Sequence, residues 1–432
     1  MKSAGWTFVL MLSAAAPAQA ATFLCDPVRG SPQGNGSPEQ PWRTFEEVLA
    51  ARLVQICDKS GTPSNPKAPV RPGDTVLLRS GWHGAIRIPG GYNRAPITIA
   101  AAPGATPQVG WVAVDGGTKW TIRGLAVSPS LAPAPLVKPP HDLVALGERG
   151  EDDCAELVVE DCFVYSVLDA SGWGAKDWME KASSGIWLGR NGRNHVARNN
   201  YVLNTRFGIN LCAPEVLCEG NVVANFSADG IRVTRDGQVV QYNVVKNVFV
   251  GDADGDDNHD DGIQCFLFNK GTGTVRDVTV RGNLVIARER DDLPFPNGMQ
   301  GIGFFDGPLV GFLVEKNVVL VNHWHGITLG DAQGCTIREN ACFSRWTGAA
   351  RPWICLGQKK RQAKGNTVRD NLAHSFDFKA DAEVVAEHNQ KVTEAAFFQK
   401  MAELAAEIDR RFGKVHPVAK RPRLEPAAGP GR

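Results

Sequence analysis

The densest group of chemically active side chains lies in residues 251–264, GDADGDDNHDDGIQ, which contain six aspartates and one histidine. Four of these carboxylates lie around a glycine, at Asp252, Asp254, Asp256 and Asp257. Carboxylates this close repel one another unless a cation lies between them, and Ca²⁺ binds about six to eight oxygen ligands. The match to an EF-hand loop is partial, because the glycine is displaced and no Glu closes the loop. We therefore expect Ca²⁺ at these four aspartates, with a solvated acidic loop as the alternative.

The acidic stretch continues into a short segment, DDGIQCF, that recurs in altered form along the chain. The six segments are SSGIWLG, RFGINLC, ADGIRVT, DDGIQCF, MQGIGFF and WHGITLG. Alternation along a strand places the residue after the glycine and the residue two positions later on one face. The inward pairs expected from this rule are Ile186 and Leu188, Ile209 and Leu211, Ile231 and Val233, Ile263 and Cys265, Ile302 and Phe304, and Ile327 and Leu329.

The outward positions of the same segments mix aromatic, cationic, acidic and amide side chains. Between the two inward residues lie Trp187, Asn210, Arg232, Gln264, Gly303 and Thr328, and before the glycine lie Ser184, Phe207, Asp229, Asp261, Gln300 and His325. Stacked strands are about 4.8 Å apart, so the polar residues of the third and fourth segments should form one exposed cluster. This cluster consists of Asp229, Arg232, Asp261 and Gln264. It suits a sugar-binding groove, and a solvated face with local ion pairs is the alternative.

Further substrate contacts are expected beside this cluster. Together with Gln264, the residues expected to bind substrate are Trp187, Arg206, Asn210, His259 and Asp260. His323 and His325 are separated by one residue, so both side chains can point to the same side of a strand. A zinc site needs further clustered ligands, and none can be assigned from the sequence.

A repeat of roughly 22 residues must position these segments. An asparagine closes one β-type run after another, at Asn200, Asn221, Asn243, Asn283, Asn317, Asn340 and Asn371. Asp161 holds the equivalent place at the start. A unit of two or three short strands with a turn Asn that tolerates αL geometry is one coil of a parallel β-helix. One coil cannot bury its apolar face alone, so the coils must stack.

These patterns resemble the right-handed parallel β-helix proteins of the pectate-lyase-like superfamily, including their asparagine ladder. The stretches GNGSPEQPWRTFEEVLAA, RPGDTVLLRSGWHGAIRI and PITIAAAPG look like the capping helix and first coils of many such secreted proteins. The resemblance covers roughly residues 22–378 and is more specific for fold than for activity. A β-sandwich or propeller would need more of the two-residue turns typical of hairpins. The expected fold class is therefore all-β, a right-handed parallel β-helix with an N-terminal capping helix and a C-terminal helix.

The organisation expected along the chain has four parts. They are a signal peptide over residues 1–20, the β-helix domain over 21–378, a C-terminal helix over 379–412 and a disordered tail rich in proline and charge over 413–432. The helix should carry Phe397, Met401, Leu404 and Ile408 on its apolar side.

Export to the periplasm or the outside of a bacterial cell is expected from the N-terminus. Lys2, a short apolar stretch and Ala18-Gln19-Ala20 are typical of a cleaved signal peptide. The apolar stretch is too short to span a bilayer, and no later segment predicts a transmembrane helix. The formal net charge of +1 argues against a nucleic-acid-binding protein.

Ten cysteines in an exported chain predict disulfides. The candidate pairs are Cys212 with Cys218, Cys335 with Cys342, and Cys25 with Cys57. Their spacings do not resemble a zinc site.

The resemblance and the outward cluster favour a polysaccharide lyase that acts on an acidic, uronate-containing polysaccharide. Elimination requires removal of the C5 proton, with a cation on the sugar carboxylate and a basic side chain as the proton acceptor. The resemblance implies Ca²⁺ together with Arg or Lys in these roles. Arg232 is the best-placed base and Arg206 the second, although the very high pKa of arginine makes this role depend on local geometry. Asp229, Asp261 and His325 complete the candidate catalytic set.

Two alternatives remain. An inverting glycoside hydrolase of the polygalacturonase type needs two carboxylates about 6.5–9.5 Å apart, and ADG at 228–230, DDG at 260–262 and HG at 325–326 follow the order that those enzymes use. A non-catalytic carbohydrate-binding or surface protein can use the same scaffold.

Overall fold

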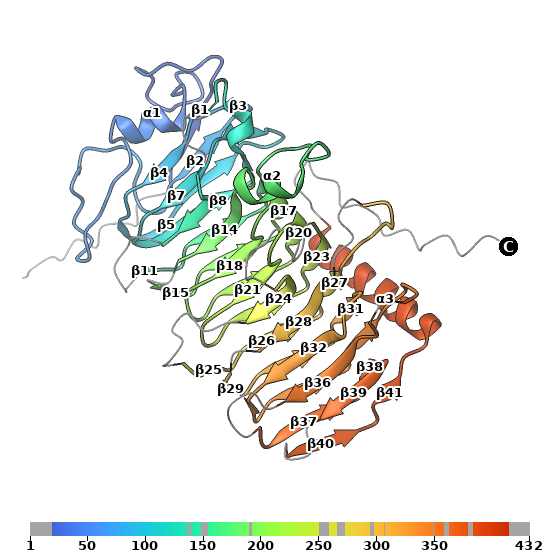
Figure 1. Ribbon diagram of the computed structural model, residues 1–432. Coiled ribbons are helices and arrows are strands. Elements are labelled where there is room, and N and C mark those ends of the chain that lie inside the picture. Colours follow the sequence, from blue (N-terminus) through green and yellow to red (C-terminus); the bar gives the residue numbers. More distant parts are fainter. Residues whose placement is uncertain are drawn as a thin grey trace, which may run out of the picture.

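Short parallel strands stack coil upon coil in the computed structural model, and the stack forms one elongated body (Figure 1). The structure describes residues 20–135, 140–147, 154–189, 192–249, 259–265, 273–293, 298–305, 307–348, 350–357, 363–378 and 383–413. The expected Ca²⁺ ligands, Asp252, Asp254, Asp256 and Asp257, and almost all of the expected signal peptide lie outside these residues.

Three long sheets run the length of the described part of the chain, with 15, 11 and 12 strands. The 11-stranded sheet carries the recurring segments. Its strands are β4 Ile86–Ile88, β7 Val112–Val114, β10 Asp142–Leu146, β14 Ser184–Leu188, β18 Ile209–Leu211, β21 Ile231–Val233, β24 Asp261–Cys265, β28 Gln300–Phe304, β32 His325–Gly330, β36 Trp353–Gly357 and β39 Ser375–Phe378.

The other two long sheets close each coil. The 15-stranded sheet contains β1 Thr22–Cys25, β2 Thr75–Leu78, β5 Tyr92–Ala101, β8 Thr118–Arg123, β11 Cys154–Ala155, β12 Val158–Glu160, β15 Gly192–Arg193, β16 Val196–Arg198, β19 Leu217–Glu219, β22 Val239–Gln241, β26 Thr279–Arg281, β30 Leu313–Glu315, β34 Thr336–Arg338, β37 Asn366–Arg369 and β40 Val384–Glu387. The 12-stranded sheet contains β3 Gly81–Trp82, β6 Pro107–Val109, β9 Ala126–Val127, β13 Phe163–Tyr165, β17 Tyr201–Thr205, β20 Val222–Phe226, β23 Val244–Val248, β27 Leu284–Ile286, β31 Val318–Leu320, β35 Ala341–Phe343, β38 Leu372–Ala373 and β41 Gln390–Lys391. A short sheet joins β25 Val275–Arg276, β29 Leu309–Val310 and β33 Ala332–Gln333. The fold is the expected right-handed parallel β-helix.

The inward register expected from the recurring segments is confirmed. Ile186, Ile209 and Ile231 pair in series across β14, β18 and β21, and the series continues through the later coils. All twelve expected inward residues are buried, with exposed fractions of 2% or less. They belong to the one large apolar core that fills the inside of the coils.

The asparagine ladder is confirmed and is one rung longer than expected. Each side-chain amide donates to the side-chain oxygen of the next asparagine at 2.9–3.0 Å, from Asn200 through Asn371 to Asn389. Two details differ from the expectation. The residue at the start of the ladder is Cys162, whose backbone N–H donates to Asn200, and not Asp161. The αL conformation falls on the residue before each ladder position, for example Asn199 at φ 50°.

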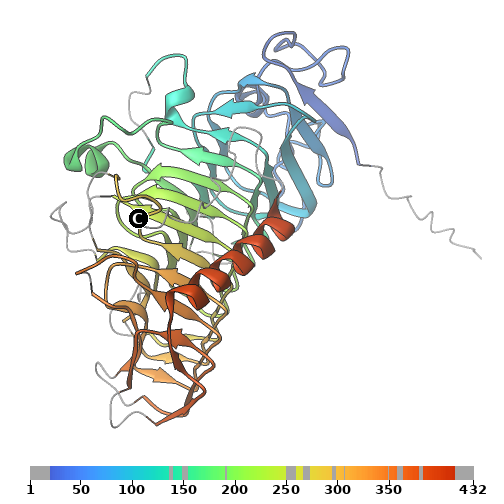
Figure 2. The same ribbon diagram turned by 90° about the vertical axis from the view of Figure 1, so that its right-hand side faces the viewer.

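Two helices cap and flank the coils as expected, and a third interrupts them. Helix α1 (Phe45–Ala50) begins at Thr44, whose side chain accepts from the backbone N–H of Glu47. Helix α3 (Glu394–Phe412) packs along the side of β27, β31 and β35 (Figure 2). Helix α2 (Ala175–Glu180) lies in the connection before β14, and a 3-10 turn spans Pro129–Leu131. Within the described residues, no helix is both long and apolar enough to cross a membrane.

The apolar face expected for the C-terminal helix is confirmed. Phe397 and Ile408 are buried, and Met401 and Leu404 pack beside them against the 12-stranded sheet. Strand pairing continues through β40 and β41 to Lys391. The expected boundary at residue 378 is therefore too early, because two further strands precede the helix.

The expected disulfides are wrong. All ten cysteines are buried, and within the described residues no disulfide joins the candidate partners Cys25, Cys57, Cys212, Cys218, Cys335 and Cys342. Several occupy core positions of stacked coils, where a small apolar side chain fits. Burial raises the pKa of the Cys162 thiol to about 12, so this cysteine stays protonated.

Candidate functional site

The outward column of the 11-stranded sheet brings the predicted cluster together. Arg232 pairs in register with Gln264, which pairs with Gly303, and Asp261 pairs with Gln300. The neighbourhood was therefore predicted correctly, but its exposure was not. Asp229 and Asp261 have no exposed surface. Alternation fixes the direction of a side chain but not what covers it, and here neighbouring outward side chains cover the two carboxyl groups.

Asp229 is held by a guanidinium and by the next coil. Its Oδ2 accepts from Nε of Arg232, and its Oδ1 accepts from the backbone N–H of Asp261 at 3.0 Å. The Arg232 guanidinium also lies 3.8 Å from the centroid of the Phe207 ring, so it covers Asp229 from the solvent side. Two charge-assisted hydrogen bonds of this kind stabilise an ionised carboxylate.

The surroundings of Asp261 are different. Burial, and then the charge of Asp229, raise the pKa of Asp261 well above its usual range. Its Oδ2 accepts from the amide of Gln264 at 3.1 Å, while its Oδ1 is buried without a hydrogen-bond partner. A methyl group built on Gly303 would clash with that Oδ1 and would lie 2.6 Å from the Phe305 ring. Only glycine leaves room for the Asp261 carboxyl group and for Phe305 beside it.

His325 is a neutral histidine whose tautomer follows from its partners. The Trp353 indole N–H donates to its Nδ1 at 3.3 Å, and the Thr328 hydroxyl lies 2.8 Å from the same atom. An indole N–H can only donate, so Nδ1 accepts and the ring proton is on Nε2. Burial lowers the pKa of His325 to about 4, with further contributions from His323 and His259. At neutral pH this residue therefore offers an N–H donor.

Aromatic rings surround His325 on the later coils. The Trp324 ring, half of whose surface is exposed, stacks on Trp353 with 6.2 Å between centroids and 22° between planes. Phe305 meets the His325 ring edge-on at 4.9 Å, and His323 stacks on it at 5.3 Å. Flat, partly exposed rings of this kind can bind the apolar face of a sugar.

The remaining predicted substrate contacts lie at the start of this column or beside Asp261. Trp187 is half-buried and pairs in register with Asn210, and Asn210 itself is buried rather than exposed. Arg206 lies 5.5 Å from the Phe207 ring, on the opposite flank from His325. His259 is exposed, and Asp260 is 4% exposed and contributes to the raised pKa of Asp261. The expectation that the substrate contacts are exposed is therefore wrong for Asn210 and Asp260.

Sequence reasoning missed Trp353 and Phe305. The segment RPWICLG continues the register, with Ile354 beside Ile327, but the ladder shifts by one residue between His325 and Ile327. This coil has no glycine before its inward residue, so the recurring pattern did not include it. Its alternation of apolar residues was the available signal.

The described residues contain no cluster of side chains suited to a metal ion. Among them, no group of three or more His, Cys, Asp or Glu side chains can hold a metal ion. The four aspartates expected to bind Ca²⁺ are not among the described residues.

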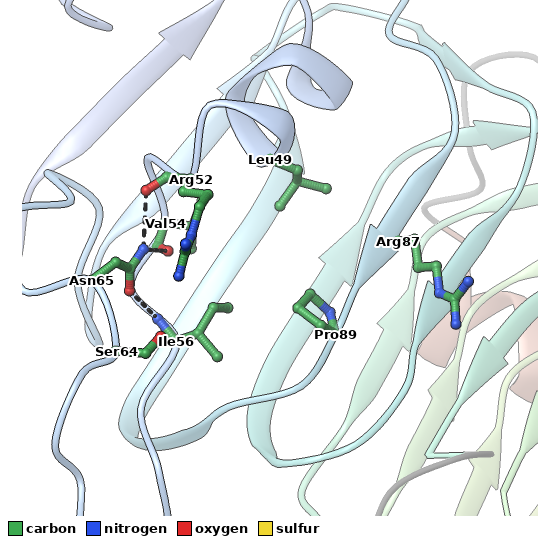
Figure 3. A pocket seen from close by; sticks show the side chains of 8 residues that line it. All are labelled: Leu49, Arg52, Val54, Ile56, Ser64, Asn65, Arg87 and Pro89. Carbon is green, nitrogen blue, oxygen red and sulfur yellow. Dashed lines mark hydrogen bonds between the residues drawn. The ribbon is translucent and has the colours of Figure 1, made fainter.

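A separate cavity of about 180 Å³ lies near the N-terminal cap (Figure 3). It is lined by Leu49, Arg52, Val54, Ile56, Ser64, Asn65, Arg87 and Pro89. The Asn65 amide bonds to the backbone of Arg52, Val54 and Ile56 and so braces the wall. Six strand spacings separate β4 from β24, roughly 30 Å, so this cavity is not part of the cluster.

Comparison with known proteins identifies the fold and not a family. No protein-family model matches the chain, and no curated protein matches it. Solved structures do match. XylC in complex with xylose has 10% identity and a TM-score of 0.51, over 81% of this chain and 75% of that one.

Two other similar structures have lower scores. A mannuronic-acid-specific lyase of polysaccharide family 6 from the human gut microbiota has 13% identity and a TM-score of 0.48, over 92% of this chain and 96% of that one. A GH136 lacto-N-biosidase from Eubacterium ramulus has 14% identity and a TM-score of 0.44, over 86% and 68%. The likeness shows a shared fold alone.

Proposed function

We propose that this protein is a carbohydrate-active enzyme that hydrolyses glycosidic bonds of an acidic polysaccharide, with Asp261 as the proton donor. The observation that carries the proposal is a pair of adjoining acidic residues, Asp229 and Asp261, whose carboxyl groups have different partners. Burial and the charge of Asp229 raise the pKa of Asp261 and favour its protonated form, whereas Asp229 is bound by Arg232. Paired carboxyl groups whose environments favour opposite protonation states are typical of acid–base catalysis on sugars.

The state of Arg232 favours hydrolysis over elimination. A lyase needs a basic side chain that can accept the C5 proton of a uronate. The Arg232 guanidinium donates to Asp229 and stacks on Phe207, and both contacts are those of a cation. In this arrangement Arg232 stabilises Asp229 and does not act as a base.

The tautomer of His325 also favours hydrolysis over elimination. Its Nδ1 accepts from Trp353, so Nε2 carries a proton and can donate to a sugar hydroxyl or ring oxygen. Trp324 and Trp353 provide the stacking surface next to it. We assign His325 to substrate binding and polarisation.

Phe305 controls access to the acid. Its ring lies next to Asp261, and it is only partly buried. A substrate that reaches the unpartnered Oδ1 of Asp261 would have to displace this side chain. Side-chain rearrangements of this size are common when substrates bind.

Screening of the purified protein against acidic and neutral polysaccharides tests the proposal. Hydrolysis produces new reducing ends without ultraviolet absorbance, whereas elimination produces an unsaturated, absorbing product. Reducing ends that require Asp261 support the proposal. Absorbing products mean that the protein is a lyase, and binding without any product means that it is a non-catalytic carbohydrate-binding protein.

We also propose that the chain is exported, as its N-terminal residues indicate, and that Ca²⁺ binds at Asp252, Asp254, Asp256 and Asp257. Both proposals are supported by the sequence pattern alone. Neither is needed for the acid–base step.

A further inference from the structure

Arg288 is a buried cation that pairs with no carboxylate of the described residues. It follows β27 by two residues and is 8% exposed. Its Nε is buried without a hydrogen-bond partner, and no ion pair of its guanidinium occurs among the described residues. The guanidinium lies 5.1 Å from the centroid of the Trp346 ring. Because arginine does not lose its proton in proteins, a full positive charge is present here.

The charges around Arg288 are otherwise balanced. Lys246 pairs with Glu289 at 2.7 Å, and Arg345 pairs with Asp291 at 3.2 Å. The exposed Arg290 pairs with Asp292 at 3.2 Å. Among the described residues, Arg288 therefore adds one positive charge that these pairs do not balance, and it is the least exposed of the three arginines. A buried charge without a partner is unfavourable, so a structural role alone does not explain it.

A second guanidinium lies near the same Trp346 ring. Arg345 is also 5.1 Å from the Trp346 ring centroid, and its Nε is buried without a hydrogen-bond partner. Beside it, the Ser344 hydroxyl is buried without a partner. Two guanidinium groups thus lie near one indole ring, and planar guanidinium groups match the two oxygens of a carboxylate or sulfate.

The register places these donors beside the candidate site. Ile286, Leu320 and Phe343 pair across β27, β31 and β35. Arg288 lies two residues after Ile286, and Arg345 lies two residues after Phe343. Their two coils are the neighbours, one on each side, of the middle coil that carries Leu320. On the middle coil only four residues separate β31 from β32, which begins at His325. That connection spans at most roughly 17 Å, so one oligosaccharide can reach both places.

We propose that Arg288 and Arg345 form a subsite for an anionic group of the polysaccharide, a carboxylate or a sulfate ester. This inference rests on the proposed function, because it assigns the substrate class of the same groove. The anion occupies the side of Trp346 where the Arg288 charge is unpaired, while neighbouring sugar rings lie toward Trp324 and His325.

Binding measurements on the full chain test the subsite separately from catalysis. The probes are an oligogalacturonate and its methyl ester, which differ in charge, and a sulfated galactan oligosaccharide and its desulfated form. Calorimetry uses the Asp261→Asn chain, so that turnover does not consume the probe. The test variant is Arg288→Gln, and the control is Arg290→Gln, two residues away on the surface.

We expect one anionic probe to bind at least roughly tenfold more tightly than its neutral counterpart, with affinity falling as salt rises. Arg288→Gln should abolish this preference, while Arg290→Gln should keep it. The melting temperature of Arg288→Gln should not fall, because an unpaired buried charge has been removed. Preference for the free acid identifies a uronate, and preference for the sulfated probe identifies a sulfate ester.

Two results would overturn the subsite. One is equal binding of charged and neutral probes by the parent chain. The other concerns Arg288→Gln: this variant has a lower melting temperature and loses binding equally for the charged and the neutral member of a probe pair. That result would mean that Arg288 has a structural role. Absence of cleavage with Arg288-dependent binding retained would contradict the proposed function and leave the subsite standing.

Discussion

The backbone N–H of Asp261 donates to Oδ1 of Asp229 at 3.0 Å, so two acidic residues on neighbouring coils are in direct contact. Arg232 binds the other oxygen of Asp229. Asp229 therefore has a cationic partner, whereas burial and the charge of Asp229 raise the pKa of Asp261. The chemistry that we assign to the groove depends on this difference.

Substitution of Asp261 by Asn should abolish turnover without destabilising the protein at neutral pH. The folded-state pKa of Asp261 is raised, so its protonation contributes stability below the unfolded pKa, about 3.9, and this contribution is lost as pH rises through the folded pKa. The asparagine side chain cannot ionise and keeps an acceptor for Gln264. The stability of Asp261→Asn relative to the wild type should therefore increase with pH above about 4. Melting curves across this range check the trend, and a relative stability that decreases with pH would show that Asp261 is ionised in the folded protein.

Removal of Arg232 should be costly, in contrast to the small effect expected from an exposed residue. Arg232→Ala leaves the fully buried Asp229 without its cation, and the loss should be roughly 3 kcal/mol of unfolding free energy. Chemical denaturation measures it, with Arg290→Ala as the surface control. Arg232→Lys should recover part of the loss, because it keeps the charge but not the planar contact with Phe207. Equal stability of Arg232→Ala and Arg290→Ala would mean that the ion pair is not formed.

The sequence predicts which residues of this site lie side by side better than it predicts how deeply they are buried. Period-two alternation and recurring glycines place Arg232 beside Gln264, and this is what the register shows. Alternation does not predict the burial of Asp229 and Asp261, which the structure places in contact with Arg232 and Gln264. The sequence pattern did not identify Trp353, because the register shifts at its coil. Arg288 had no sequence signal, since only the structure reveals that its charge is unpaired.

NMR of His325 should reveal one tautomer at neutral pH. Nitrogen chemical shifts are expected to show a proton on Nε2, because Trp353 donates to Nδ1. The pKa of His325 is lowered to about 4, so the stability due to its neutral form is present above the unfolded pKa of about 6.5 and is lost as pH falls toward 4. Trp353→Phe keeps the aromatic contact and removes the donor, and it should raise the pKa. A wild-type His325 that titrates near 6.5 would contradict this description.

Calcium binding is expected from the four aspartates between residues 252 and 257. Calorimetry should detect Ca²⁺ binding, and chelation should lower the melting temperature. The variant in which Asp254 and Asp256 are changed to Asn should lose both effects, whereas the exposed Asp292→Asn should keep them. No heat and no change on chelation would leave a solvated acidic loop as the explanation.

The central claim is that Asp261 donates a proton during hydrolysis, and mass spectrometry of the products tests it most directly. Wild-type protein incubated with the polysaccharide that it cleaves should release oligosaccharides that each contain the elements of one added water. Under the same conditions Asp261→Asn should release none while binding the substrate. Unsaturated products that lack the added water, or full activity in Asp261→Asn, would contradict the account.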